Sequence, residues 1–216
     1  LATSSAASDV YKRQLQGIVG KLALNTPLDL EDGVVLFNHP DLHELGALAN
    51  AVREARFGRQ AFFNSNVHIN QTNICVLACR FCAFRRGPKA DDAYAMSVDE
   101  YVADLAQYAH AVDEVHSVGG LHPEWGVEHY ESLFRRVSDE HPHVSIKALT
   151  AVEIKHLAQR SSISTLDVLK RLRQAGLMSL PGGGAEILDD EVRAVICNGK
   201  ETVSYTHLTL PTTLQV

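Results

Sequence analysis

The sequence has few aromatic residues, few cysteines and no long apolar run. Aromatic residues make up 6% of the 216 residues, hydrophobic residues 45% and charged residues 21%, as in an ordinary globular chain. No apolar stretch approaches the roughly 20 residues of a membrane helix, so we expect no membrane partner. The 20 basic residues are outnumbered by 26 acidic ones, which argues against nucleic-acid binding. No signal peptide is visible, so a cytoplasmic location is expected.

Both ends of the chain are predicted to be translated sequencing adapter. Residues Ser4 to Gln14 (SSAASDVYKRQ) and Val203 to Thr212 (VSYTHLTLPT) correspond to translations of the two opposite strands of one transposase adapter. The alternative interpretation is a disordered Ser/Ala-rich leader and a Thr-rich edge strand. We therefore assign residues 1–14 and 202–216 to adapter, and expect an internal fragment of a longer gene between them.

The first part of this internal segment, residues 15–60, is predicted to be helical. Apolar residues recur at helical spacing between Leu42 and Ala49, and Asp41 is a favourable capping residue. We expect a helix from Asp41 to Arg56.

From residue 61 to residue 201, β-rich runs alternate with helical patterns. The strand candidates are residues 62–70, 114–118, 144–149 and 177–180. The helix candidates are residues 97–112, 130–137 and 165–175. Ser97 and Glu100 form a capping box, and Gly176 ends the last helix. This alternation predicts an α/β fold with a parallel sheet, in which chemistry lies at the carboxyl ends of the strands.

Three of the four cysteines follow the pattern Cys75-x3-Cys79-x2-Cys82. Such clustering favours metal ligation over a disulfide. A structural zinc site would need a fourth Cys or His, whereas three thiolates leave one iron of a four-iron cluster open. The three cysteines are therefore predicted cluster ligands, with a zinc-binding structural module as the non-enzymatic alternative. Cys197 is interpreted as a small buried hydrophobic residue.

The cysteine motif and its flanking blocks resemble the radical S-adenosylmethionine (SAM) superfamily. The resemblance is carried by HINQTNICVLACRFCAF (68–84), VGGLHP (118–123), IKALTAVEI (146–154) and LPGGGAEI (180–187). These blocks look like the menaquinone-pathway enzymes of the futalosine route. KALTAVE (147–153) and ICNGK (196–200) are most similar to the aminofutalosine (aminodeoxyfutalosine) synthase family. Dehypoxanthine futalosine cyclases and FO-synthase-like enzymes stay open as alternatives.

This resemblance implies a radical SAM partial TIM barrel, preceded by a helical cap. It covers residues 15 to 201, which would be about the N-terminal half of such an enzyme, with the barrel half at residues 61–201. Half a barrel leaves open sheet edges and an exposed apolar interior. We expect this truncated chain to be inactive and to fold poorly.

The resemblance also implies the cofactors and the reaction. Cys75, Cys79 and Cys82 would hold a [4Fe–4S] cluster, whose open iron would bind SAM. In aminofutalosine synthases the 5′-deoxyadenosyl radical adds to the chorismate-derived enol ether 3-[(1-carboxyvinyl)oxy]benzoate, and loss of carboxylate gives aminofutalosine. In the alternative families the radical abstracts hydrogen instead. A reductant such as flavodoxin or ferredoxin is the expected protein partner.

Several further residues are expected to contact SAM or the substrate. The SAM-binding candidates are Phe81, Gly119, Gly120, Glu153 and Glu186. At the two adjacent glycines a missing Cβ lets backbone carbonyls approach a ligand closely. The catalytic candidates are Lys147, for a carboxylate of SAM or substrate, and His68 and His122, for the substrate carboxylates. His116, His129 and His156 receive much less weight, because most histidines lie at surfaces or caps.

Overall fold

The computed structural model describes residues 15–182, 187 and 189–200. The chain divides into two compact units, Leu1–Phe63 and Asn64–Val216. Glu186, one of the predicted SAM-binding residues, lies outside the described residues. No helix among the described residues is long and apolar enough to cross a membrane.

The described part of the first unit is helical. Residues 15–23 form one helix, followed by α2 (Leu30–Asn38) and α3 (Leu42–Phe57). The Asp41 side chain accepts hydrogen bonds from the first backbone N–H groups of α3, and Gly58 ends that helix with a φ of +60°. The helix predicted from Asp41 to Arg56 is thus confirmed.

The second unit contains a four-stranded parallel sheet in the order β1-β2-β3-β4. The strands are β1 (Asn66–His68), β2 (Glu114–Ser117), β3 (Ser145–Ala148) and β4 (Leu177–Ser179). Each lies within or close to one of the four predicted runs, and β1 is much shorter than its run. Consecutive strands are neighbours, as in a βα barrel, and the strand order does not reverse as it does in a doubly wound sheet.

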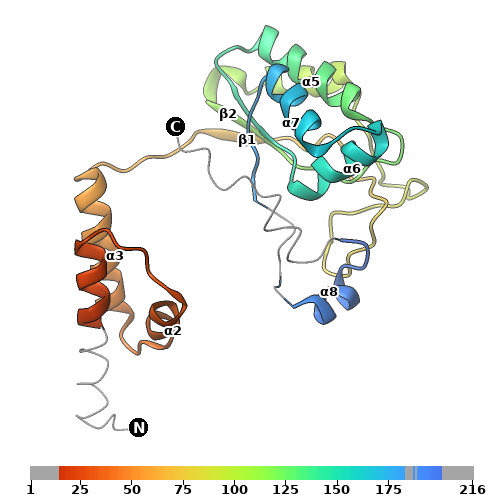
Figure 1. The fold of residues 1–216 in the computed structure, drawn as a ribbon. Coiled ribbons are helices and arrows are strands. Elements are labelled where there is room, and N and C mark those ends of the chain that lie inside the picture. The colour runs from red at the N-terminus through yellow and green to blue at the C-terminus, as the bar shows by residue number, and fades with distance from the viewer. Residues whose placement is uncertain (1–14, 183–186, 188, 201–216) are drawn as a thin grey trace. The chain divides into compact units, whose positions relative to one another are not determined.

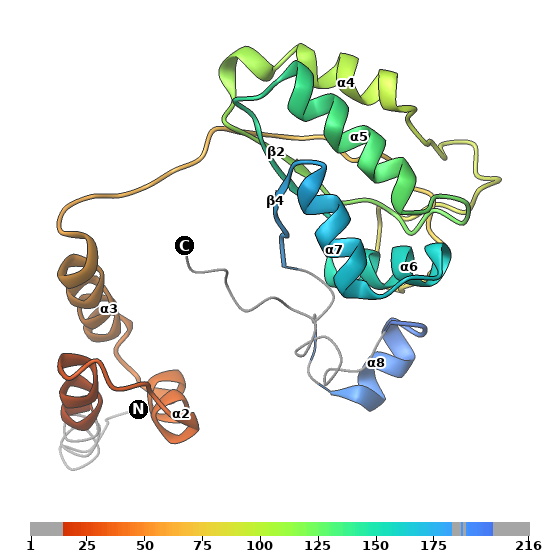
Figure 2. The ribbon, with the colours of Figure 1, turned by 45° about the horizontal axis from the view of Figure 1, so that its top comes forward.

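Four helices lie together along one side of this sheet (Figures 1 and 2). They are α4 (Val98–Ala106), α5 (Val127–Glu140), α6 (Ala151–Ser161) and α7 (Thr165–Gln174). A 3-10 helix (Ala109–Ala111) follows α4, and α8 (Asp190–Ile196) follows β4. The predicted helices correspond to α4, α5 and α7, whereas α6 and α8 were not predicted. The signal for α6 is the capping box of Thr150 and Glu153.

The hydrophobic core lies between the sheet and these helices. Val115 and Ile146 contribute from the strands, and Leu105, Phe134 and Leu172 contribute from the helices. Each is at most 2% exposed, and burial of such a side chain contributes about 1.5–3 kcal/mol. Because strand side chains alternate between faces, the residues next to them in sequence face away from the helices. The helix-free face of the sheet is therefore the face that carries its polar residues.

Candidate functional site

A cavity of about 570 Å³ lies at the carboxyl ends of the strands, beside the cysteine loop. Eight of the predicted site residues line it: His68, Cys75, Cys79, Phe81, Cys82, Gly119, Gly120 and Glu153. They come from β1, the cysteine loop, the turn after β2 and the start of α6. The fold thus brings segments that lie far apart in the sequence, from His68 to Lys200, to one cavity.

The cysteine loop is closed at its base by backbone hydrogen bonds. The N–H of Cys75 donates to the carbonyl of Arg86 at 3.1 Å, and the N–H of Arg86 donates to the carbonyl of Asn73 at 2.7 Å. The next residue, Val76, donates to the carbonyl of Leu121 at 3.0 Å. The loop is therefore tied both to itself and to the turn that follows β2.

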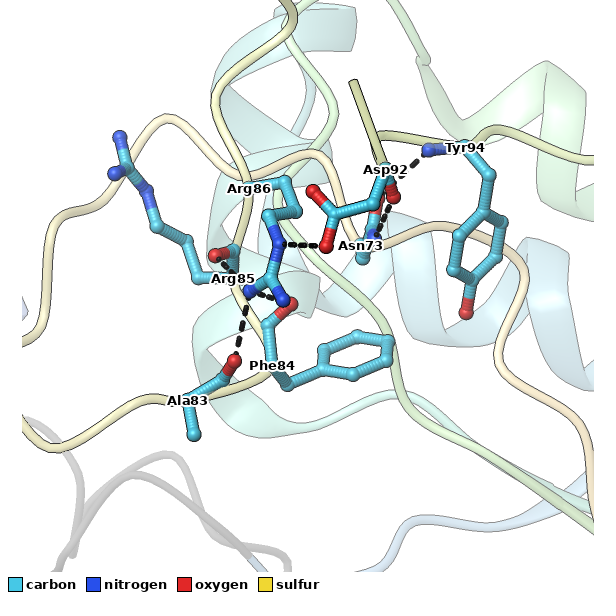
Figure 3. Close-up of polar contacts among 7 residues, drawn as sticks. All are labelled: Asn73, Ala83, Phe84, Arg85, Arg86, Asp92 and Tyr94. Atoms are coloured by element: carbon cyan, nitrogen blue, oxygen red, sulfur yellow. Dashed lines mark hydrogen bonds and ion pairs between the residues drawn. The ribbon is translucent and has the colours of Figure 1, made fainter. Parts of the chain in front are cut away.

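The Arg86 side chain binds the C-terminal part of this loop (Figure 3). Its Nη1 donates to the carbonyl oxygens of the three preceding residues, 83–85, at 2.8 to 3.4 Å. Its Nε donates to Asp92 Oδ2 at 2.6 Å. The Asn73 amide also reaches this segment, since its Nδ2 donates to the Asp92 carbonyl and its Oδ1 accepts from the Tyr94 N–H. These contacts order the segment that follows Cys82 without using the thiols.

The three motif thiols are free and partly exposed, whereas Cys197 is buried, as expected. Burial raises the pKa of the Cys79 thiol, and the positive charge of Lys200 opposes that rise. Among the described residues, no three His, Cys, Asp or Glu side chains are arranged to hold a single metal ion. The three partly exposed thiols all line the cavity, so they are accessible to a ligand that binds there.

Phe81 and Lys200 form a further wall of the cavity. The Lys200 Nζ lies 5.2 Å from the centroid of the Phe81 ring, within the range of a cation–π contact. Both residues line the cavity, although Lys200 was not among the predicted site residues. Its segment is held in place because the N–H of Arg80 donates to the carbonyl of Ile196 at 2.7 Å.

The glycine turn after β2 packs directly against the cysteine loop. A Cβ at Gly120 would overlap the Ile74 carbonyl oxygen and lie 3.0 Å from the Cβ of Cys75. A Cβ at Gly119 would lie 2.8 Å from Nε2 of Gln71. The N–H of Gly120 also donates to the carbonyl of Thr72 at 2.9 Å. The glycines are thus required by close contact between two backbone segments, besides any contact with a ligand.

Glu153 is buried beside this turn, with 4% of its surface exposed. Its Oε1 accepts from the N–H of Gly119 at 3.0 Å, and its Oε2 accepts from the N–H of Thr150 at 2.7 Å. Burial raises the pKa of this carboxyl to about 7, against the opposing effect of the two hydrogen bonds. Both oxygens are therefore engaged by the protein's own backbone.

A row of basic side chains crosses the helix-free face of the sheet. His68 pairs in register with His116, and His116 pairs with Lys147. The two imidazole rings are stacked, with centroids 4.7 Å apart. Lys147 Nζ lies 3.8 Å from Oε1 of Glu114, an ion pair just beyond hydrogen-bond distance. His116 lines the cavity, whereas Lys147 is not among its lining residues.

His122 lies in a different setting from His68. It is 9% exposed, its ring stacks on Trp125 at 4.2 Å, and its Nδ1 accepts from the N–H of Glu124. Trp125 in turn stacks on His129 at 3.8 Å. His122 is not among the residues that line the cavity, and its assignment to the substrate stays a prediction.

The combination of a three-cysteine loop and a glycine turn at the ends of parallel βα strands agrees with one protein family. The profile of the Radical SAM superfamily matches residues 69–206, well over half of the chain. The chain belongs to the radical SAM superfamily. The cofactors of this family are a [4Fe–4S] cluster and SAM, and the three cysteines that the family requires are present at the expected spacing.

Several curated proteins are similar to this chain. Aminodeoxyfutalosine synthase of Streptomyces coelicolor is 42% identical over 84% of this chain and 46% of its own length. The synthase of the same name from Thermus thermophilus is 39% identical over 85% of this chain and 50% of its own length. Cyclic dehypoxanthine futalosine synthase of S. coelicolor is 34% identical over 88% of this chain and 49% of its own length. The chain thus spans about half the length of the curated relatives it matches.

The solved structures show the same fold. Methylornithine synthase matches with a TM-score of 0.66 and 18% identity, over 88% of this chain and 53% of that one. This likeness confirms the predicted radical SAM α/β architecture, of which the chain contains a part.

Proposed function

We propose that the enzyme to which this chain belongs is an aminofutalosine-forming transferase of menaquinone biosynthesis. It would join the 5′-deoxyadenosyl group of SAM to 3-[(1-carboxyvinyl)oxy]benzoate. The observation that carries the proposal is the 42% and 39% identity to two aminodeoxyfutalosine synthases over 84% and 85% of this chain. Because the chain spans only about half of these relatives, the proposal concerns the whole enzyme.

In this proposal the cavity is the cofactor site. Cys75, Cys79 and Cys82 would hold the cluster, and the turn of Gly119 and Gly120 would present its backbone to SAM. When bound, the cluster and SAM supply one electron and the 5′-deoxyadenosyl radical. The described residues would position these groups and restrict the access of water to them. Glu153 would act by fixing the glycine turn, since both its oxygens already accept backbone hydrogen bonds.

The remaining parts of the proposal concern the residues that contact the substrate and the cofactor, the electron donor and the location of the enzyme. His68 and His122 would orient the substrate carboxylates, and Lys147 would pair with a carboxylate of SAM or of the substrate. Phe81 would make an aromatic contact near the cluster, and Glu186, outside the described residues, would lie near the ribose. A flavodoxin or ferredoxin would deliver the electron, and the enzyme would be cytoplasmic.

The second candidate is hydrogen abstraction, favoured by the 34% identity to cyclic dehypoxanthine futalosine synthase. Anaerobic turnover with isotopically labelled SAM separates the two reactions. We expect the adenosine carbons to appear in a product joined to the benzoate. Release of all the label as 5′-deoxyadenosine would contradict the proposal and favour abstraction. Full occupancy by zinc in place of iron and sulfide would instead favour a structural module.

A further inference from the structure

The three strands β1, β2 and β3 each present one basic side chain at the same level of the sheet. His68, His116 and Lys147 are register partners across the three strands. Register partners in adjacent strands point to the same face, so the three side chains form a continuous row. The stacking of the two imidazoles, 4.7 Å apart and inclined by 13°, shows that the row is tightly spaced.

The core fixes which face this row occupies. Val115 and Ile146, the neighbours of His116 and Lys147, are 0% and 2% exposed in the core beneath the helices. A slip of the register by one residue would bury the basic groups and expose these apolar ones, so the arrangement is strongly specified. His68 and His116 line the cavity that contains the three cysteines.

We propose that His68, His116 and Lys147 form a carboxylate-binding row, and that His116 is a substrate-binding residue of this enzyme. A neutral imidazole offers one N–H donor and lysine offers an ammonium group, so a carboxylate meets donors from neighbouring strands. The Lys147 charge beside the imidazoles disfavours a metal cation there. Two carboxylates are chemically suitable, the aryl carboxylate of the substrate and the methionine carboxylate of SAM. The first of these rests on the proposed function.

The charges around His116 predict a link between binding and protonation. The groups that face it are His68 from β1, Glu114 on its own strand and Lys147 from β3, while β4 places the uncharged Ser179 beside Lys147. Burial, His68 and Lys147 lower the pKa of His116, and Glu114 raises it. A bound carboxylate favours the protonated ring, so binding takes up a proton and tightens as the pH falls below neutral.

The test measures the binding of two separate probes to the purified protein by calorimetry. Benzoate represents the aryl carboxylate, and S-adenosylhomocysteine represents the carboxylate of SAM. We expect His116→Gln to weaken benzoate binding about tenfold, the loss of one charge-assisted hydrogen bond, and to reduce its pH dependence. His110→Gln, at an exposed histidine of the 3-10 helix, is the matched control and should change neither.

Histidine ring resonances of the unmodified protein provide a readout that does not depend on the folding of a variant. Benzoate should shift the resonances of His68 and His116 and leave that of His110 in place. If His116→Gln weakens only S-adenosylhomocysteine, the row binds a carboxylate but the substrate assignment of His116 is wrong. If His116→Gln binds both probes with unchanged affinity and no histidine resonance moves, the proposal that this row binds a carboxylate is wrong.

Failure of the proposed function would look different. Absence of an adenosylated product, with benzoate binding that still depends on His116, would overturn the proposed reaction and leave the row intact. Normal product formation with an unchanged KM for the benzoate substrate in His116→Gln would overturn the row and leave the reaction intact.

Discussion

Glu153 at the start of α6 accepts a hydrogen bond from the N–H of Gly119, which lies 34 residues earlier, at 3.0 Å. The same carboxylate completes the capping box of α6 with Thr150. One buried side chain thus joins a helix start to the turn that packs on the cysteine loop. A change at Glu153 should therefore affect the folded state and the cofactor site together.

The first prediction concerns the pH dependence of stability at Glu153. Its pKa is about 7 in the folded protein, against an ordinary value of 4.5 for a glutamate, so the folded state binds more protons between these values. The stabilisation that this group provides is complete below pH 4.5 and is lost as the pH rises through 7. The loss amounts to about 3 kcal/mol at most, at about 1.4 kcal/mol for each pKa unit. Thermal unfolding between pH 4 and 8 should show that Glu153→Gln lacks this decrease in stability at rising pH.

The matched control is Glu191→Gln, at an exposed position in the first turn of α8. Its unfolding temperature should follow the same pH profile as the unmodified protein. An identical profile for Glu153→Gln would mean that the carboxyl does not titrate in this range.

The second prediction separates the motif cysteines from Cys197. Anaerobic reconstitution with iron and sulfide should give a brown protein with broad visible absorbance. Serine at Cys75, Cys79 or Cys82 should abolish most of this absorbance, because a thiolate ligand is lost. Cys197→Ala should retain it, since that thiol is buried. Loss of the absorbance only in Cys197→Ala would contradict the assignment of ligands.

The third prediction tests the contact between the glycine turn and the cysteine loop. Gly120→Ala should lower the free energy of unfolding by about 1–3 kcal/mol, because its Cβ has no space beside the Ile74 carbonyl. Gly87→Ala is the control, since a Cβ at Gly87 has no neighbour within 4 Å. The displacement should also weaken SAM binding, measured with S-adenosylhomocysteine. Equal stability of the two variants would show that the turn can move aside.

The pattern of the sequence predicted the strands and the caps because both are local signals. Asp41 and Ser97 cap the helices that they were expected to start. The second of the missed helices, α8, begins at Asp190 with a cap from Asp189, a weaker signal over only seven residues. Short elements of this kind carry little periodicity, so their existence depends on tertiary packing.

The cysteines and glycines that the sequence motifs select do line the cavity, whereas the place of the histidines was harder to predict. A motif gives the spacing of ligands along the chain, but the partner of His68 across the sheet depends on strand register. His116 was given little weight because most histidines lie at surfaces or caps, although it alternates with buried Val115 in a predicted strand. The stacked setting of His122 depends in the same way on a turn that the sequence pattern does not specify.

A second buried titratable group acts in the opposite direction to Glu153. His129 stacks on Trp125 at 3.8 Å, and its Nε2 is buried without a hydrogen-bond partner among the described residues. Burial lowers the pKa of His129 to about 4, from the ordinary value of 6.5 for a histidine. The unfolded state therefore binds more protons between these values, and stability is lost as the pH falls from 6.5 to 4.

The fourth prediction follows from the overlap of these two ranges. As the pH rises from about 4.5 to 6.5, Glu153 lowers the stability of the folded state and His129 raises it. The two effects oppose each other, so the stability of the unmodified protein should change little with pH in this range. His129→Phe keeps a ring on Trp125 and removes the titration, so it should be more stable than the unmodified protein at pH 5 and fall in stability toward pH 7. His110→Phe, at an exposed histidine, is the control and should leave this weak pH dependence unchanged. Unfolding monitored by Trp125 fluorescence measures all three profiles. If the stability of His129→Phe and that of the unmodified protein depend on pH with the same slope, His129 has the same pKa in the folded and unfolded states. Stacking on Trp125 would then not lower its pKa.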